Sequence, residues 1–224
     1  QITKSHPEVL DSLDNYSFRD TNPEAVLESL KSQISKDFPG LPPNNYTVKY
    51  VPKALEGSLS PAFYLVPPMD RYEDNVIYIN QNPRFQNEDL FTTLAHEGYP
   101  GHLYQNVYFL SKEPSDLRSI LSFSSYSEGW ATYVEYYSYT LDNGLSPELG
   151  KLLAANAAVT LGIYAYLDIC INYEGWDKEQ AAEYLNTFYK VENTDIADTI
   201  YNSLVENPTN YMEYYVGFLE ITEM

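Results

Sequence analysis

The sequence of 224 residues contains a single cysteine, Cys170, and only three histidines. One cysteine excludes an internal disulfide and any metal site built on several thiolates. Because Cys170 stands in the apolar run 163–171, we interpret it as a small buried hydrophobic residue. Such a low cysteine content fits a cytoplasmic protein and equally a secreted bacterial one.

Basic residues are also scarce, since 13 Lys and Arg stand against 32 Asp and Glu and the formal net charge is -19. A nucleic-acid-binding surface needs clustered Lys and Arg, so we exclude nucleic acid as a partner. The charge also disfavours direct contact with anionic membranes. An acidic surface keeps a protein soluble and can attract cations or basic peptides, and solubility is the more general explanation.

Targeting signals are missing too. We find no signal peptide and no apolar stretch that we judge long enough to span a bilayer. The sequence begins at Gln1 and stops within an expected helix, so we expect it to be part of a longer protein. Hydrophobic residues make up 44% and charged residues 20%, which indicates a globular chain rather than a disordered one.

The pattern along the chain predicts an early helix, a small sheet and a long helical region. Residues 1–22 look irregular or partly extended, and Asn22 is the expected N-cap of a helix at 23–36. Strands are predicted at 46–51, 62–66 and 76–80. Further helices are predicted at 88–99, 102–110, 127–141, 147–173, 178–189, 195–204 and 209–224. We therefore expect a mostly helical α+β fold, with an N-terminal segment 1–45 and a domain 46–224.

Two of the three histidines lie within seven residues, in the segment His96-Glu97-Gly98-Tyr99-Pro100-Gly101-His102. Neutral imidazoles bind zinc, and a neighbouring carboxylate can take a proton from a water at the metal. His96 and His102 are therefore predicted ligands of Zn²⁺, with Glu97 as general base. In the common motif the histidines are four residues apart and face one side of a helix. Here they are six apart, about 120° out of line on an ideal helix.

Pro100 and Gly101 can resolve this mismatch. Proline removes a helical hydrogen bond, and glycine accepts unusual dihedral angles. We therefore predict a break at 98–101 that returns His102 toward His96. The alternative is that the His-Glu pair makes an ordinary hydrogen bond and that His102 simply follows a Pro-Gly turn.

A third ligand is expected from Glu128, 26 positions beyond His102 and in the first turn of the predicted helix at 127. Two histidines and a glutamate are a usual zinc-ligand set that leaves a fourth position for water. The alternative for Glu128 is favourable interaction with the positive helix N-terminus. Glu135, further along the same helix, is expected either to support a ligand or to lie on the surface.

The stretch 94–105 resembles the signature of the bacterial zincin-like proteins of domain of unknown function 885 (DUF885): His-Glu, two variable positions, Pro-Gly-His and a nearby Gln. Residues 128–131, Glu-Gly-Trp-Ala, followed by Tyr133 resemble a second motif of that family. Pro208, Tyr214 and Gly217 match a C-terminal pattern, and 76–80 resembles a family strand that ends in Asn. The matches run in family order from about residue 60 to the end. Leu103 departs from the pattern, because the family often doubles the second histidine.

The resemblance implies a zincin-like (gluzincin) core with the small sheet packed beside the metal-binding helices, and a further helical region before this segment in full-length members. It also assigns Tyr214 as the group that stabilises the oxyanion, although packing is a simpler role among 23 tyrosines. The strand at 76–80 would either offer an edge to an extended peptide or be fully paired. Trp130 is expected to pack behind Glu128, and His6 to lie on the surface.

Together these patterns predict a zinc metallopeptidase that acts on a peptide or small amide substrate. An extracellular or cell-envelope location is favoured over a cytoplasmic one, and the oligomeric state stays open. The alternatives are a metal-dependent esterase or amidase, and an inactive binding or structural module of the same fold.

Overall fold

The computed structural model describes residues 2–13, 15–85, 89–189 and 194–224. The chain divides into two compact units. The first comprises residues 1–123 and 130–154, and the second comprises residues 124–129 and 155–224. Two long helices, α6 (Ser124–Ser138) and α7 (Pro147–Asn172), each contribute residues to both units.

The first unit contains a three-stranded sheet in the order β1-β3-β2. Its strands are β1 (Asn45–Tyr50), β2 (Ala62–Leu65) and β3 (Asp74–Ile79). The central strand β3 runs parallel to β1 and antiparallel to β2. The three predicted strands are confirmed, but the idea of an exposed edge at 76–80 is wrong, because β3 is paired on both sides.

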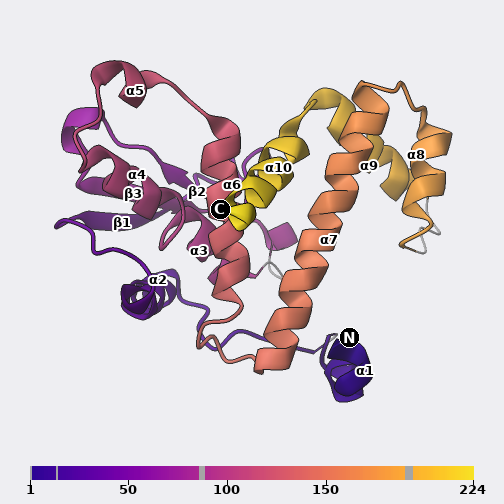
Figure 1. Cartoon of the computed structure of the whole chain (residues 1–224), viewed down its shortest axis with the longest axis horizontal. Helices are drawn as coiled ribbons and strands as arrows, with labels where there is room; N and C mark the ends of the chain where they lie inside the picture. Colours follow the sequence, from indigo (N-terminus) through magenta and orange to yellow (C-terminus); the bar gives the residue numbers. More distant parts are fainter. Residues whose placement is uncertain (1, 14, 86–88, 190–193) are drawn as a thin grey trace. The chain divides into compact units, whose positions relative to one another are not determined.

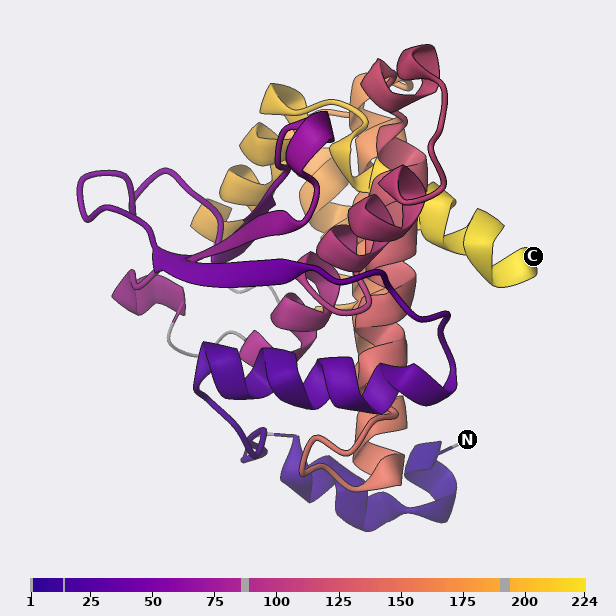
Figure 2. The same cartoon turned by 90° about the vertical axis from the view of Figure 1, so that its left-hand side faces the viewer.

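The helices α2 (Pro23–Gln33), α3 (Leu90–Glu97) and α4 (His102–Leu110) pack with this sheet around one apolar core. Figure 2 shows α2 lying alongside the strands. The predicted cap of α2 is confirmed, since Asn22 Oδ1 accepts a hydrogen bond from Ala25 N at 2.9 Å. Although α2 belongs to the expected N-terminal segment 1–45, it shares the core of the sheet. The fully buried members of this core include Val26, Leu27, Leu30, Ile77, Leu94, Leu103 and Val107.

Short helical segments account for the remaining differences from the sequence predictions. Residues expected to be irregular form α1 (Ile2–Ser5) and the 3-10 helix η1 (Pro7–Ser12), which begins at a proline. His6 does lie at the surface, with its side chain 45% exposed beside Glu8. The short helix α5 (Asp116–Ile120) was not predicted. The expected helix start at 88 lies outside the described residues.

Single-turn 3-10 helices complete the first unit: η2 (Ile34–Lys36), η3 (Met69–Arg71) and η4 (Pro83–Phe85). η2 extends α2 to the predicted end of that helix, at residue 36. The other two lie in the connections on either side of β3.

The regular elements of the second unit are all helices among its described residues. Beside parts of α6 and α7 it contains α8 (Lys178–Leu185), α9 (Thr194–Glu206) and α10 (Asn210–Glu223), shown in Figure 1. A capping box begins α8: Asp177 Oδ1 accepts from Gln180 N, and Gln180 Oε1 accepts from Asp177 N. The core is made of apolar residues from α7, α8 and α9: Ile163, Leu167, Ile171, Ala181, Leu185, Ala197 and Leu204.

Helix α7 corrects one further expectation. With 26 residues it is long enough, and apolar enough, to cross a membrane by length and composition alone. Our judgement that no stretch of the chain reaches this length was therefore wrong, although a single such helix is weak evidence for a membrane span. The fold as a whole is the expected mostly helical α+β arrangement with a small sheet.

Candidate metal centre

The helix that carries His96 is interrupted where the sequence predicts a break. Helix α3 ends at Glu97, and α4 begins at His102. The Tyr99–Pro100 peptide between them is cis. A Cβ atom at Gly101 would lie 1.7 Å from the His96 carbonyl oxygen, so only glycine fits there. The close approach of Gly101 to the end of α3 is what brings the start of α4 back beside it.

The interruption brings the two imidazoles together. The ring centroids of His96 and His102 are 4.8 Å apart, and the ring planes are inclined by 82°. His96 is nearly buried, with 9% of its surface exposed. A spacing of six residues, which would separate the two rings on a straight helix, therefore produces convergence here.

One nitrogen of His96 is held by a carboxylate. His96 Nδ1 lies 2.9 Å from Glu135 Oε2, which is a hydrogen bond. An ionised carboxylate can only accept, so Nδ1 is the donor in this bond, and in a neutral imidazole Nε2 is then the nitrogen that can bind a metal. This is the arrangement in which proteins orient a metal-binding histidine. Of the two expectations for Glu135, support of a ligand is the one that the geometry matches.

Glu128 lies on α6, which begins at Ser124 rather than at 127. Glu128 is therefore in the second turn of α6. Attraction to the positive N-terminus of the helix is confined to the first turn, so it does not explain a carboxylate at this position. Two residues further along the same helix, Trp130 Nε1 donates to the Pro100 carbonyl at 2.8 Å. Because α6 is continuous, this bond and the one to Glu135 fix it against the α3–α4 turn. Trp130 thus holds α6 against that turn by a hydrogen bond, whereas the sequence predicts only that it packs behind Glu128.

These three residues form a group that can hold a metal ion. His96, His102 and Glu128 each offer one ligand atom, and the three atoms all lie within 4.8 Å of one another. Zn–N and Zn–O bonds are about 2.0–2.1 Å long, so ligand atoms on one tetrahedral zinc are roughly 3.3 Å apart. Small side-chain rotations would cover the difference. The donor set of two imidazoles and one carboxylate also suits zinc.

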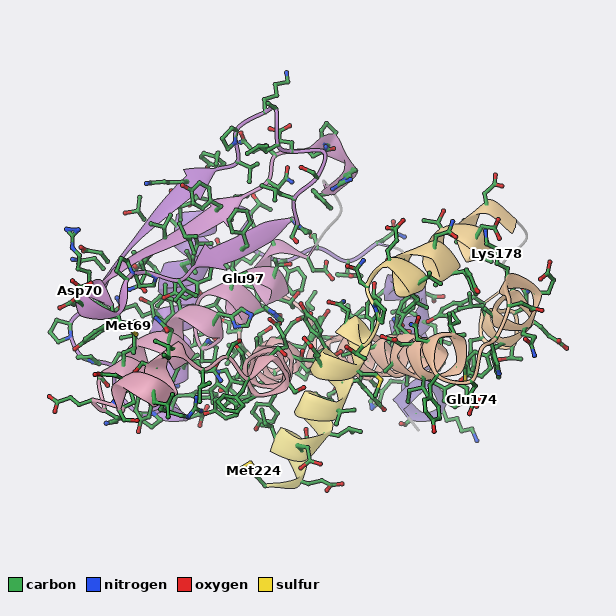
Figure 3. All side chains as sticks on the ribbon, turned by 90° about the horizontal axis from the view of Figure 1, so that it is seen from above. Met69, Asp70, Glu97, Glu174, Lys178 and Met224 are labelled. Atoms are coloured by element: carbon green, nitrogen blue, oxygen red, sulfur yellow. The ribbon has the colours of Figure 1, made fainter. Side chains whose placement is uncertain are left out.

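Glu97 is held next to this group by the sheet. The backbone N–H of Tyr64, on the outer strand β2, donates to Glu97 Oε2 at 2.8 Å. Figure 3 shows Glu97 between the sheet and the helices. The bond fixes one carboxylate oxygen. No sequence pattern could have revealed this contact, because the donor is a backbone group.

Tyr214 lies on α10 in the second unit and is half-buried. This helix crosses α6 in very close contact, since a Cβ atom at Gly129 would lie 2.2 Å from the Gly217 carbonyl carbon. Tyr214 precedes Gly217 by three residues and so shares its helix face. The side of α10 that carries Tyr214 is therefore the side that meets α6 next to Glu128. Both glycines belong to the two motifs singled out in the sequence.

Asp89 is a further carboxylate, close enough to Glu135 for their charges to interact. Asp89 accepts a hydrogen bond from the Tyr16 hydroxyl at 2.9 Å. Burial raises the pKa of Asp89 above its ordinary value, and the nearby charge of Glu135 adds to the effect. Burial, with the bond to Asp89, also raises the pKa of Tyr16, to about 12. Tyr139, 7% exposed, covers the same region, and burial raises its pKa as well.

Comparison with known proteins places the chain in a family. The sequence profile described as "Bacterial protein of unknown function (DUF885)" matches residues 20–224. The chain belongs to the DUF885 family. None of the curated proteins compared with this DUF885 chain matches it significantly.

Two solved structures share the fold of the DUF885 chain. One is a putative lipoprotein from Colwellia psychrerythraea, with a TM-score of 0.73 and 22% sequence identity over 100% of this chain. The other is a putative lipoprotein of unknown function from Shewanella oneidensis, with a TM-score of 0.57 and 19% identity over 99% of this chain. The DUF885 chain spans only 37% and 38% of their lengths.

Proposed function

We propose that this chain carries a single zinc ion on His96, His102 and Glu128 and hydrolyses peptide bonds. The observation that carries the proposal is the convergence of three ligand atoms to within 4.8 Å of one another, beside a carboxylate that immediately follows one ligand. Such a set leaves a coordination position open for water, which catalytic zinc sites require and structural zinc sites lack. The proposal includes a gluzincin-like arrangement of the site, with its third ligand on a second helix.

His96, His102 and Glu128 would hold the zinc ion, which would supply Lewis acidity to a water and to the substrate carbonyl. Glu97 accepts the proton of that water and later donates it to the leaving amine. The bond from Tyr64 N–H holds one Glu97 oxygen and so orients the carboxylate for this transfer. Tyr214 donates a hydrogen bond to the oxyanion from the face of α10 that meets α6.

A peptide substrate is favoured by the strand beside Glu97. Among the described residues β2 pairs only with β3, so its other edge faces away from the sheet. That edge reaches Glu97, as the bond from Tyr64 N–H demonstrates. An extended peptide that adds to a sheet edge by backbone hydrogen bonds would run past the carboxylate. An ester without a peptide backbone would gain nothing from this edge.

We extend the proposal to the cell envelope as the location. Two proteins with the same fold are described as putative lipoproteins, and lipoproteins are membrane-anchored. The support comes from fold similarity alone, and the proposed chemistry does not depend on it.

The test is cleavage of a peptide library by the zinc-loaded chain, with Glu97→Gln as control. This variant keeps the three ligands and the size of the side chain, so it should bind zinc normally. Loss of general-base catalysis should lower the rate by about 10²- to 10⁴-fold. Cleavage of ester or small amide substrates but no peptides would favour the esterase or amidase alternative. Stoichiometric zinc without any hydrolysis would favour a binding or structural module.

A further inference from the structure

The second unit is much more acidic than the first. Its residues, 124–129 and 155–224, include thirteen Asp and Glu but only two basic residues, Lys178 and Lys190, so it holds -11 of the net charge of -19. Lys178 is already engaged: its Nζ lies 3.2 Å from Asp198 Oδ2 and 5.8 Å from the centroid of the Tyr201 ring. A unit of this charge attracts cations over its surface.

Four aromatic rings form a connected and partly exposed patch on this unit, here called the aromatic surface: Tyr166, Trp176, Tyr184 and Phe188. Tyr184 is the centre, with ring centroids 5.0 Å from Tyr166, 5.9 Å from Trp176 and 5.2 Å from Phe188. Tyr166 is 46% exposed and Phe188 is 51% exposed. Connected exposed aromatic area of this kind marks an interaction site more often than scattered apolar residues do.

The rings of the aromatic surface are fixed in place by the core on which they pack. Trp176 and Tyr184 pack against the buried core of α7, α8 and α9. The Trp176 carbonyl also accepts a hydrogen bond from the Tyr201 hydroxyl at 3.2 Å. Phe188 lies in the turn after α8, and its ring packs on Tyr184 with the centroids 5.2 Å apart. The rings are therefore ordered before any partner arrives, which lowers the entropic cost of binding.

Negative charge lies next to these rings. Glu174 and Asp177 flank Trp176 in the sequence, and both are exposed. The pKa of Tyr166 is raised, chiefly by its hydrogen bond with the Cys170 thiol and further by the charge of Glu174. Figure 3 shows Glu174 well apart from Lys178. The rings thus lie beside acidic groups, while Lys178, the one basic side chain described in this unit, is paired with Asp198.

We propose that the aromatic surface docks a polypeptide segment that carries Lys or Arg side chains. Aromatic ring faces attract ammonium and guanidinium groups, and the aliphatic stems of these side chains cover apolar area. A neutral sugar could stack on the same rings but would gain nothing from the charge of -11. A second copy of this chain would bring an equally acidic unit and be repelled. The docking surface does not depend on the metal centre.

The experiment measures binding of dye-labelled octalysine and octaarginine to the full chain by fluorescence anisotropy. Octaglutamate and a Gly-Ser octapeptide serve as comparison probes. The cationic peptides should bind, more weakly as salt is added, and the other two should not. Tyr166→Leu and Phe188→Leu should each weaken binding about two- to fivefold, as expected for an exposed cation–π contact, and Tyr166→Phe should not.

Phe123→Leu is the matched control, because Phe123 is also 51% exposed but belongs to the first unit. It should leave the affinity unchanged, and circular dichroism checks that all variants keep their helices. Unchanged affinity in Tyr166→Leu and Phe188→Leu would overturn the proposal, since diffuse charge attraction would then suffice. Equal binding of the Gly-Ser peptide would also overturn the proposal. So would displacement of octalysine by a neutral oligosaccharide. Dimerisation of the chain that is lost in Tyr166→Leu or Phe188→Leu would overturn it as well.

Discussion

Replacing Gly101 by alanine tests the geometry on which the metal centre depends. The added methyl group would lie 1.7 Å from the His96 carbonyl oxygen and 2.4 Å from the Ala95 carbonyl oxygen. Non-bonded heavy atoms are comfortable at roughly 3.5 Å, so the turn would have to move by about 1.5 to 2 Å. The obstructing atoms belong to the backbone of α3, so side-chain rotation cannot relieve the clash.

The consequences are a loss of stability and a loss of zinc. Overpacking costs about 1–3 kcal/mol when side chains can adjust, and we expect about 3 kcal/mol or more here. A displacement of His102 by more than 1 Å also exceeds the tolerance of about 0.2 Å on metal–ligand distances. Zinc affinity should fall by more than about 100-fold, because losing a group that merely supports a ligand already costs 10- to 100-fold.

The assays are urea denaturation and elemental analysis after dialysis against a weak chelator. Gly40→Ala is the control, because a Cβ atom there meets nothing within 4 Å. It should change the free energy of unfolding by no more than about 0.5 kcal/mol and leave the zinc content unchanged. The reasoning is refuted if Gly101→Ala matches the wild type in denaturation midpoint and in zinc content.

Three further predictions concern the surroundings of the site. Glu135→Gln should lower zinc affinity about 10- to 100-fold, measured by competition with a chelator, because the carboxylate no longer fixes the proton on Nδ1 of His96. Trp130→Phe should lower the free energy of unfolding by about 1–3 kcal/mol in urea denaturation, since it leaves a carbonyl in the α3–α4 turn without its indole donor. The raised pKa of Asp89 means that the folded state favours the protonated carboxyl. This group therefore stabilises the fold at pH values below its ordinary pKa. The stabilisation is lost as the pH rises through the pKa of Asp89 in the folded state. Asp89→Asn should therefore gain stability relative to the wild type between pH 4 and pH 7, and a constant difference across urea titrations in this range would contradict the assignment.

Much of the helical organisation could be predicted because its signals are local. Asn22 before Pro23 and Asp177 with Gln180 are capping patterns that need only neighbouring residues, and both are formed. The interruption after Glu97 was equally readable, since proline and glycine restrict or release the backbone regardless of tertiary context.

The pairing of the strands could not be predicted in the same way. Three short strands fix neither their order nor their direction, so the central place of β3 depends on long-range packing. The sequence predicts the start of α6 at 127, with Glu128 in its first turn, whereas the helix begins at Ser124. That difference of three residues changed the interpretation of the carboxylate.

The candidate site, too, combines features that the sequence predicts with features that it does not. Its ligand types and the break between the histidines follow from the sequence, because metal chemistry restricts the choice of residues. Its supporting contacts do not, since Glu135 reaches His96 from another helix and the Tyr64 donor is a backbone group. The family resemblance assigns Tyr214 to the site, and the close contact of Gly129 with Gly217 brings the face of α10 that carries Tyr214 against α6.

The most direct measurement is X-ray absorption at the zinc edge on the zinc-loaded chain, beside its zinc stoichiometry. We predict one zinc per chain, with two imidazole nitrogens and oxygen donors at about 2.0–2.1 Å. The imidazole signal should fall to one ring in His102→Ala. A stoichiometry near zero, or an unchanged spectrum in that variant, would contradict the convergence of His96 and His102 on one ion.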